Sequence, residues 1–490
     1  MEIRHIVCRA LVPVLLLFVG PIACDAAGTS PGKGSQVSNN PASVQARKLL
    51  EAINSGDRAV LEAYREDNFS PEWKEAPDVD VGLHKHKEFG GFDLIEVDDD
   101  RPHNLHGWVR ARDSDAVLEF VVETERAAPH RVNFVHLDWG NSPTKFRVPR
   151  LSEADAIEAW RADTSRRAQA DKFSGVILLA RGDEVLLREA YGFADREGKV
   201  PNTVDTRFRT ASTSKMFTAA AVLRLVQDGK LKLDDRIGKI VPALADKPIS
   251  TATIHQLLTH TSGAGDFYGP RNDEHRKELQ THDDFIRIFG GDPLLFAPGK
   301  KFEYHNLGFM YLGAAIEHVS GKSFYDYLQQ SIFGPAGMKH TDTPPVDVDM
   351  RGRAQGYFRP PGEREWIPAG QHLEYRADGA GGAWSTADDM RRFLGALRAH
   401  RILDEKFTRL MLEPKTEAWK GHGYGYGIWV DEYPGGGLWI GGTGGEMGSN
   451  SEAWFNPASG YQVIVLSNLD FGAAKNVSEF VRARLPVPVR

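Results

Sequence analysis

The stretch FRTASTSKMFTAAAVLRLVQDG, residues 208–229, decides how this chain of 490 residues is interpreted. It holds a Ser-x-x-Lys motif, Ser212 to Lys215, at the start of a run with helically spaced apolar residues and a terminal Gly229. Positions i and i+3 share one helix face, so we expect Lys215 to meet Ser212. The helix N-terminus favours a developing oxyanion, and a desolvated lysine can act as a base. A plain N-cap at Ser212 explains the motif equally well.

Other serine motifs fit poorly. Ser-x-x-Lys recurs at Ser30 and Ser142, but both copies contain proline and lie in loop-like sequence. The run 28–32 matches G-x-S-x-G, which needs a preceding strand and a following helix, and neither is predicted there.

A tyrosine and an asparagine supply the next element. Tyr304-His305-Asn306 precedes an apolar helical run, 307–319. A tyrosine near a cationic lysine can accept the proton of a serine, and Asn306 can bind substrate or hold Lys215. A surface turn with a helix cap is the alternative interpretation of this tripeptide.

A glycine-rich run, 441–448, lies between two strand-like runs. Glycines allow the backbone to approach a ligand closely. A phosphate-binding loop would need a following helix and a Gly-Lys-Ser/Thr ending, and both are missing.

Strand-like sequence stands at both ends of the region from residue 150 to 490. The early runs are 176–180 and 184–190, and the late runs are 425–430, 437–440, 452–456 and 461–468. Helical patterns dominate residues 207–410. We therefore predict an α/β (α+β) fold, with an antiparallel sheet flanked by helices and an all-helical lobe.

Residues 42–148 predict a separate small α+β domain. A helical stretch, 44–64, precedes strand-like runs at 91–97, 105–112, 116–123 and 131–137. The pattern resembles the cone-like nuclear-transport-factor-like or cystatin-like folds. Its histidines, His84, His86, His103 and His106, match no compact ligand pattern, so we expect neither a metal nor a cofactor.

The N-terminus predicts export. Residues 1–27 have the basic, apolar and small-residue order of a signal peptide, too short for a membrane span, and residues 28–41 form a linker. Both cysteines, Cys8 and Cys24, lie in the signal, so the exported body has no disulfide; Cys24 is a candidate lipid anchor. We expect a periplasmic or extracellular location. The net charge of −7 argues against nucleic acid as a partner.

Taken in order, Ser212-x-x-Lys215, Tyr304-x-Asn306 and Thr443-Gly444 resemble the serine β-lactamase and penicillin-binding-protein superfamily. The resemblance covers about residues 165–485 and is strongest to the branch of class C β-lactamases, D-Ala-D-Ala carboxypeptidases and esterases. Lesser signatures agree: 208–215 with Phe217, 257–263, 337–341, and 381–386 followed by Asp389.

The resemblance implies an acyl-enzyme mechanism. Ser212 would attack a carbonyl while Lys215 and Tyr304 share its proton, and the substrate would be a small ester, amide or peptide. The backbone N–H groups of Ser212 and Gly445 would form the oxyanion hole. His260 is expected to be structural. The residues implied to bind the substrate are Asn306, Thr443, Gly444 and Gly445.

One position departs from the family. The third motif usually begins with Lys, His or Trp, and here that position is Gly442. The cation that meets a substrate carboxylate is absent from this position, which favours an esterase or amidase. A D-Ala-D-Ala carboxypeptidase or a β-lactamase is the first alternative, and a non-catalytic binding or sensor protein is the second.

Overall fold

The computed structural model describes residues 38–73, 79–138, 143–346, 348, 351–360, 365–419, 421–433 and 437–488. The predicted signal segment, most of the linker, Cys8 and Cys24 lie outside these residues. The described chain forms two compact units, divided near Arg150, and each is considered by itself. In the part of the chain described, no helix has the length and apolar character needed to cross a bilayer.

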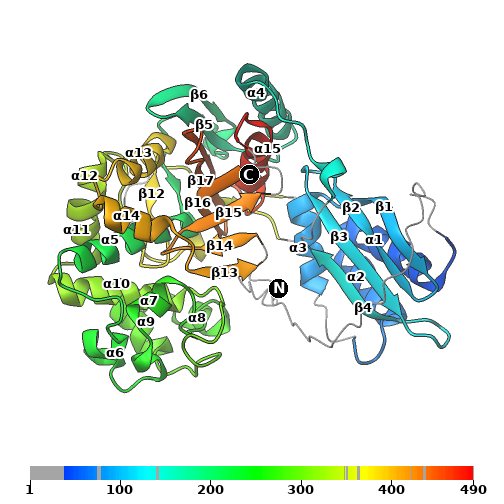
Figure 1. Cartoon of the computed structure of the whole chain (residues 1–490), viewed down its shortest axis with the longest axis horizontal. Coiled ribbons are helices and arrows are strands. Elements are labelled where there is room, and N and C mark those ends of the chain that lie inside the picture. The colour runs from blue at the N-terminus through cyan, green and yellow to red at the C-terminus, as the bar shows by residue number, and fades with distance from the viewer. Residues whose placement is uncertain are drawn as a thin grey trace. The chain divides into compact units, whose positions relative to one another are not determined.

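The first unit packs three helices against one sheet. Its strands pair antiparallel in the order β1-β2-β3-β4 (Figure 1). Gly56, in the left-handed region at φ 63°, ends the first helix, and Asp57 caps the second through the N–H groups of Ala59 and Val60. The strands fall within four residues of the predicted runs. The elements are α1 (Pro41–Ser55), α2 (Arg58–Asn68), α3 (Val79–Phe89), β1 (Phe92–Arg101), β2 (Asn104–Ala111), β3 (Val117–Thr124) and β4 (Val132–Asp138).

An antiparallel sheet forms the centre of the second unit, as predicted. Its order among the described residues is β13-β14-β15-β16-β17-β18-β5-β6, so the two ends of this unit meet where β18 pairs with β5. The strands are β5 (Gly175–Arg181), β6 (Glu184–Tyr191), β13 (Thr416–Trp419), β14 (His422–Tyr424), β15 (Trp429–Tyr433), β16 (Gly437–Glu446), β17 (Ser449–Phe455) and β18 (Tyr461–Ser467). Short pairs accompany it: β7 (Phe193–Asp195) with β8 (Val200–Pro201), β9 (Phe208–Arg209) with β12 (Trp384–Ser385), and β10 (Tyr357–Phe358) with β11 (Ile367–Pro368).

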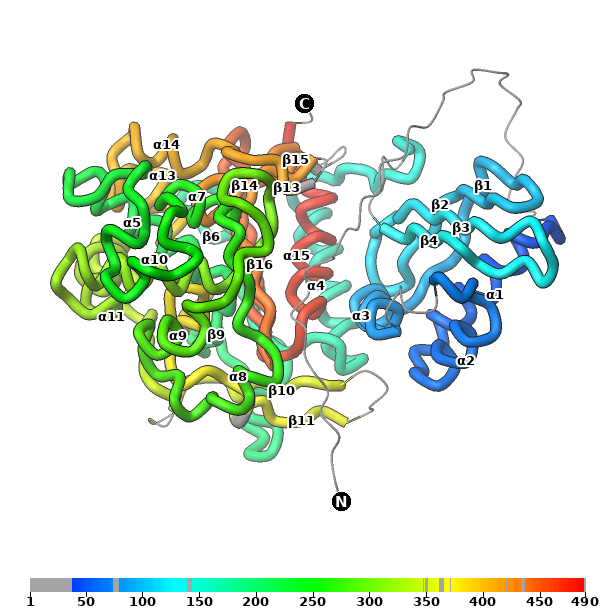
Figure 2. Tube along the Cα trace, turned by 90° about the horizontal axis from the view of Figure 1, so that it is seen from below, coloured from blue at the N-terminus to red at the C-terminus, as the bar shows by residue number. Residues whose placement is uncertain are grey.

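Helices cover both faces of this sheet. The terminal helices α4 (Glu153–Gln169) and α15 (Ala473–Arg484) lie side by side on one face (Figure 2), and the Trp160 indole donates to the Val477 carbonyl at 2.9 Å. Alternate residues such as Ile177 and Val463 point to that face, while Leu178 and Ile464 point to the opposite core.

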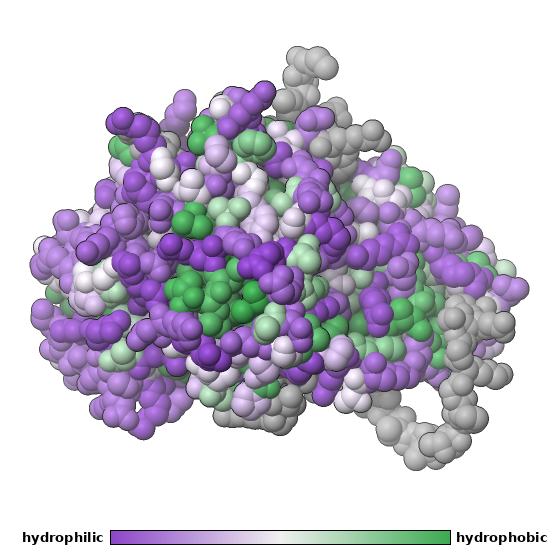
Figure 3. Space-filling model, turned by 90° about the horizontal axis from the view of Figure 1, so that it is seen from above, coloured by the Kyte–Doolittle hydropathy of each residue, from purple (hydrophilic) through white to green (hydrophobic). Residues whose placement is uncertain are grey.

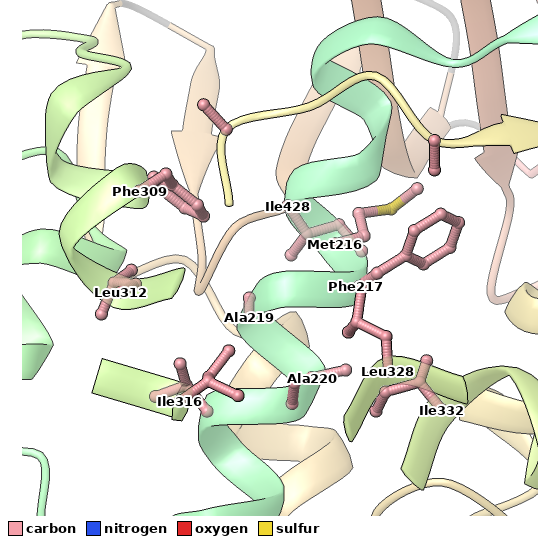
Figure 4. Packing of buried hydrophobic residues seen from close by; sticks show 14 of the residues in the cluster. Met216, Phe217, Ala219, Ala220, Phe309, Leu312, Ile316, Leu328, Ile332 and Ile428 are labelled. Carbon is pink, nitrogen blue, oxygen red and sulfur yellow. The ribbon is translucent and has the colours of Figure 1, made fainter. Parts of the chain in front are cut away.

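The opposite core centres on α5 (Lys215–Gln227), whose apolar residues are buried on nearly every side. Phe217 meets Phe333 and Phe393 edge to face at centroid distances of 5.2 and 4.8 Å. Figure 4 shows Met216 and Phe217 of α5 among residues of neighbouring helices. The helices that the described residues of this unit form between β9 and β13, apart from α5, are α6 (Ile237–Ile240), α7 (Ile254–Leu258), α8 (Pro270–His275), α9 (His282–Phe289), α10 (Leu307–Ser320), α11 (Phe324–Leu328), α12 (Gly334–Ala336), α13 (Ala387–Arg398) and α14 (Glu405–Leu412).

The outer surface is largely hydrophilic with local apolar patches, as one face shows in Figure 3. Exposed large apolar side chains include Leu295, Phe193 and Val185, which are far apart in the sequence. Scattered exposed apolar residues are ordinary for a folded domain and mark no particular site.

Candidate active site

Ser212 lies in a tight turn between β9 and α5. The 3₁₀ turn Ala211–Ser214 leads directly into α5, which begins at Lys215. Ala211 has a φ of 43°, in the left-handed region, which costs a non-glycine residue of the order of 1–3 kcal/mol. Its carbonyl accepts from the N–H of Gly382 at 3.1 Å, and Thr210 donates its N–H to Ala383 at 2.8 Å. The segment after Asp378 therefore holds the serine turn in place.

Lys215 reaches three oxygens from one buried position. Its Nζ lies 3.2 Å from Ser212 Oγ, 2.7 Å from Asn306 Oδ1 and 2.7 Å from the Ala380 carbonyl. The residue is 1% exposed. The predicted contact between Lys215 and Ser212 is present. The Asn306 side chain and the Ala380 carbonyl hold the amine in this position as hydrogen-bond acceptors.

Asn306 connects the lysine to a buried carboxyl group. Its Nδ2 donates to Asp266 Oδ2 at 2.8 Å, and Asp266 also accepts the N–H of Phe267 at 2.7 Å. Burial raises the pKa of Asp266 in spite of these donors. Asp266 was not predicted from the sequence, although it lies three residues after the 257–263 signature.

Tyr304 approaches the lysine with its ring. Lys215 Nζ lies 4.9 Å from the ring centroid, and the ring packs between His260 at 4.3 Å and Trp429 at 6.2 Å. The Tyr304 hydroxyl makes no hydrogen bond to any residue that the structure describes. The structure thus brings the phenol beside the amine, within the same group as Ser212 and Asn306.

His260 supports this tyrosine from a fully buried position. Its Nδ1 accepts the N–H of His305 at 3.2 Å, and its Nε2 lies 3.0 Å from the Tyr424 hydroxyl. Burial lowers the pKa of His260 well below 6.5 and that of His305 to about 3. These contacts to neighbouring protein groups suit the structural role expected for His260.

The glycine-rich run belongs to strand β16 itself, which continues to Glu446 rather than ending at Ile440 as predicted. A Cβ atom at Gly444 would lie 2.6 Å from the Thr210 carbonyl, so the strand can pass the serine turn only with glycine there. Thr443 points to the other face, where its hydroxyl donates to Glu452 Oε1 at 2.5 Å. Among the described residues β15 pairs with β16 only as far as Gly441, which leaves the following backbone as a strand edge.

A pocket of about 270 Å³, including space open to solvent, lies beside Ser212. It brings together Ser212 and Gly445, while Tyr304, Asn306, Thr443 and Gly444 are not among its described lining residues. Burial, with Glu446 nearby, raises the pKa of Glu374 to about 7, and burial also raises the pKa of Asp378. The lining residues are Ala211, Ser212, Phe267, Tyr268, Glu374, Asp378, Ala380, Gly381, Gly445 and Glu446.

Comparison with known proteins decides the family. The Beta-lactamase family profile matches residues 161–486, about two-thirds of the chain. The chain belongs to the β-lactamase family. The predictions of a β-lactamase-related fold and of a serine hydrolase are confirmed at the level of that family.

Several members of the β-lactamase family are similar to this chain. Esterase EstB of Burkholderia gladioli is 31% identical over 299 residues, which are 53% of this chain and 73% of EstB. Protein flp of Staphylococcus aureus is 33% identical over 184 residues, so the chain matches only 37% of the length of flp and 37% of its own.

Two solved structures share the fold. A penicillin-binding protein from Bacillus halodurans is 32% identical with a TM-score of 0.60, covering 67% of this chain and 98% of that one. The D-amino acid amidase from Ochrobactrum anthropi is 27% identical with a TM-score of 0.57, covering 67% and 97%. The family thus includes esterase, amidase and penicillin-binding relatives.

Proposed function

We propose that this protein is an exported serine hydrolase that forms an acyl-enzyme on Ser212 from an ester or amide. The observation that carries the proposal is the 3.2 Å contact between Lys215 Nζ and Ser212 Oγ. A neutral amine has two N–H donors and one lone pair. The Asn306 and Ala380 oxygens accept two N–H groups of Lys215, which leaves the remaining position on Nζ directed at Ser212 Oγ.

The chemistry follows from this arrangement. Lys215 takes the proton as Ser212 attacks the substrate carbonyl, and the adjacent Tyr304 phenol relays that proton to the leaving group. The N–H groups of Ser212 and Gly445 stabilise the oxyanion, a contribution of about 3–4 kcal/mol for one such donor. Water then hydrolyses the acyl-enzyme.

An uncharged ester or amide fits the site better than a substrate whose carboxylate would have to be bound by the residue at position 442. Gly442 has no side chain to meet a carboxylate, and a Cβ atom there would lie 3.2 Å from Met216 Cε. Arg209 is not among the described residues that line the pocket, because it pairs with Glu446 at 2.6 Å. The similarity to EstB and to the D-amino acid amidase supports the same choice.

Labelling by a fluorophosphonate probe tests the proposal. We expect the wild type to be labelled and to hydrolyse p-nitrophenyl esters, and Ser212→Ala to do neither. A wild-type protein that is folded yet unlabelled and inactive on every ester would instead support the non-catalytic binding protein.

The domain boundaries and the export of the protein are part of the same proposal. We propose an export signal at residues 1–27, a linker at 28–41, a small domain at 42–148 and the hydrolase domain at 150–490. Mass measurement of the mature protein tests the signal, because cleavage near Ala26 or lipidation of Cys24 would change its N-terminal mass. An intact Met1 in exported protein would contradict the first boundary.

A further inference from the structure

The pocket beside Ser212 is lined by an unusual number of acidic side chains. Glu374, Asp378 and Glu446 all contribute to it, and these come from two distant segments of the chain. Asp378 uses Oδ1 to accept the N–H groups of Ala380 and Gly381 at 2.7 and 3.0 Å. Since this pocket contains Ser212, its charge acts on the substrate whose acyl group Ser212 receives.

The nearby cations do not cancel this charge. Arg209 is 4% exposed at its side chain and is shared between Glu446, at 2.6 Å, and Glu374, at 3.4 Å. It borders a separate hollow behind these carboxylates, together with Phe208 and Trp384. One guanidinium therefore faces two glutamates. Among the described residues Asp378 accepts hydrogen bonds through Oδ1, and its electrostatic neighbours are His282, Lys215 and Arg209.

Lys215 does not reverse the balance. Its Nζ is occupied by Ser212, Asn306 and the Ala380 carbonyl, and it acts as the base only when it is neutral. In the reactive state the pocket then holds three carboxyl groups against one buried arginine, and because the pKa of Glu374 is about 7 and that of Asp378 is raised, its negative charge grows as the pH rises. An anionic substrate group would be repelled there, and a cationic group would find carboxylate acceptors.

Aromatic rings complete the lining. Phe267 and Tyr268 lie against each other with centroids 4.5 Å apart, and both belong to the pocket. Aromatic faces and carboxylates together suit an ammonium carried on an apolar chain.

We propose that the pocket beside Ser212 selects substrates with a positively charged group on the acyl side, an ammonium ester or amide. This inference rests on the proposed acylation of Ser212 and adds the substrate class to it.

Three p-nitrophenyl esters of equal chain length test the charge directly. The 6-aminohexanoate, heptanoate and heptanedioate monoester carry an ammonium, a methyl group and a carboxylate at the same place. We expect kcat/KM to be roughly tenfold higher for the ammonium ester than for the heptanoate, the size of one charge-assisted contact, and lowest for the carboxylate. Equal or reversed values would overturn the inference.

Glu374→Gln is the informative variant, since it removes one charge and retains an amide oxygen for Arg209. We expect the ammonium-to-methyl ratio to fall by about tenfold, whereas the exposed-surface control Glu184→Gln keeps the wild-type ratio. Each ratio is measured within one protein, so a general loss of activity cancels. An unchanged ratio in Glu374→Gln contradicts the assignment.

A binding measurement separates this inference from the proposed hydrolysis. In Ser212→Ala, calorimetry should show 6-aminohexanamide binding at least tenfold more tightly than heptanamide. Glu374 faces Glu446, Asp378, Arg209 and the Tyr268 hydroxyl, and its pKa is about 7, so amine binding should strengthen as pH rises from 6 to 8. If the protein binds the amine but turns over no ester, the proposed hydrolysis is rejected and the inference about the charged group stands. If it turns over esters without preferring the amine, the hydrolysis stands and the inference is rejected.

Discussion

Replacing Asn306 by alanine removes the bridge between the lysine and the buried Asp266. The amide is 6% exposed and makes two hydrogen bonds, of 2.7 Å to Lys215 Nζ and 2.8 Å to Asp266 Oδ2. A hydrogen bond to a charged group contributes about 1.5–3 kcal/mol. If the lysine contact acts fully in the transition state, acylation slows by about 10–150-fold. The lost contact to Asp266 appears separately, as reduced stability.

The assay is the second-order rate constant for labelling of Ser212 by a fluorophosphonate, measured on folded protein. His255→Ala is the matched control, because the His255 ring makes a 2.8 Å bond to the Tyr426 hydroxyl that does not involve the serine or the lysine. We expect the control to be labelled at the wild-type rate. An Asn306→Ala rate within twofold of the wild type would refute the role given to this amide.

Three more changes test the surroundings of the site. Lys215→Ala should slow acylation by at least about 10³-fold, far more than His260→Ala, in single-turnover labelling; equal losses would contradict the roles assigned to these two residues. Arg209→Met leaves two glutamates buried without their cation and should lower the unfolding free energy by about 3–5 kcal/mol in urea titration. Burial raises the pKa of Glu452 from 4.5 to about 7, so the folded state binds more protons and this residue's contribution to stability falls as pH rises between those values. Glu452→Gln should remove roughly 2–3 kcal/mol of that fall between pH 5 and 8, and a variant with the wild-type pH profile would contradict the assignment.

Local spacing predicted the contact between Ser212 and Lys215. Ser212 and Lys215 are three residues apart, so one helical turn brings them together whatever surrounds them. The alternating strands at both ends of the hydrolase region were also predictable from their own residues. Strand β15 was not: the prediction began it at residue 425, but Gly427 has a φ of 66° and a Cβ there would lie 2.5 Å from Ala219 Cβ. That close approach to α5 delays the strand to Trp429.

The acidic lining of the pocket was not predictable from local pattern. Glu374 and Glu446 are far apart in the sequence, and single carboxylates in loops give no signal of their own. Only the fold places both against Arg209. Thr443 shows the converse. Its place in the motif was recognisable from the sequence, but the direction of its side chain was not: its hydroxyl donates to Glu452 on the other face of the sheet.

The most direct test of the account is the intact mass of the protein after brief exposure to esters, β-lactams and D-Ala-terminated peptides. We predict a covalent acyl adduct with the esters, located at Ser212 by peptide mapping and lost in Ser212→Ala. An adduct on any other residue, or ester hydrolysis that persists in Ser212→Ala, would contradict the central claim that this serine is the nucleophile.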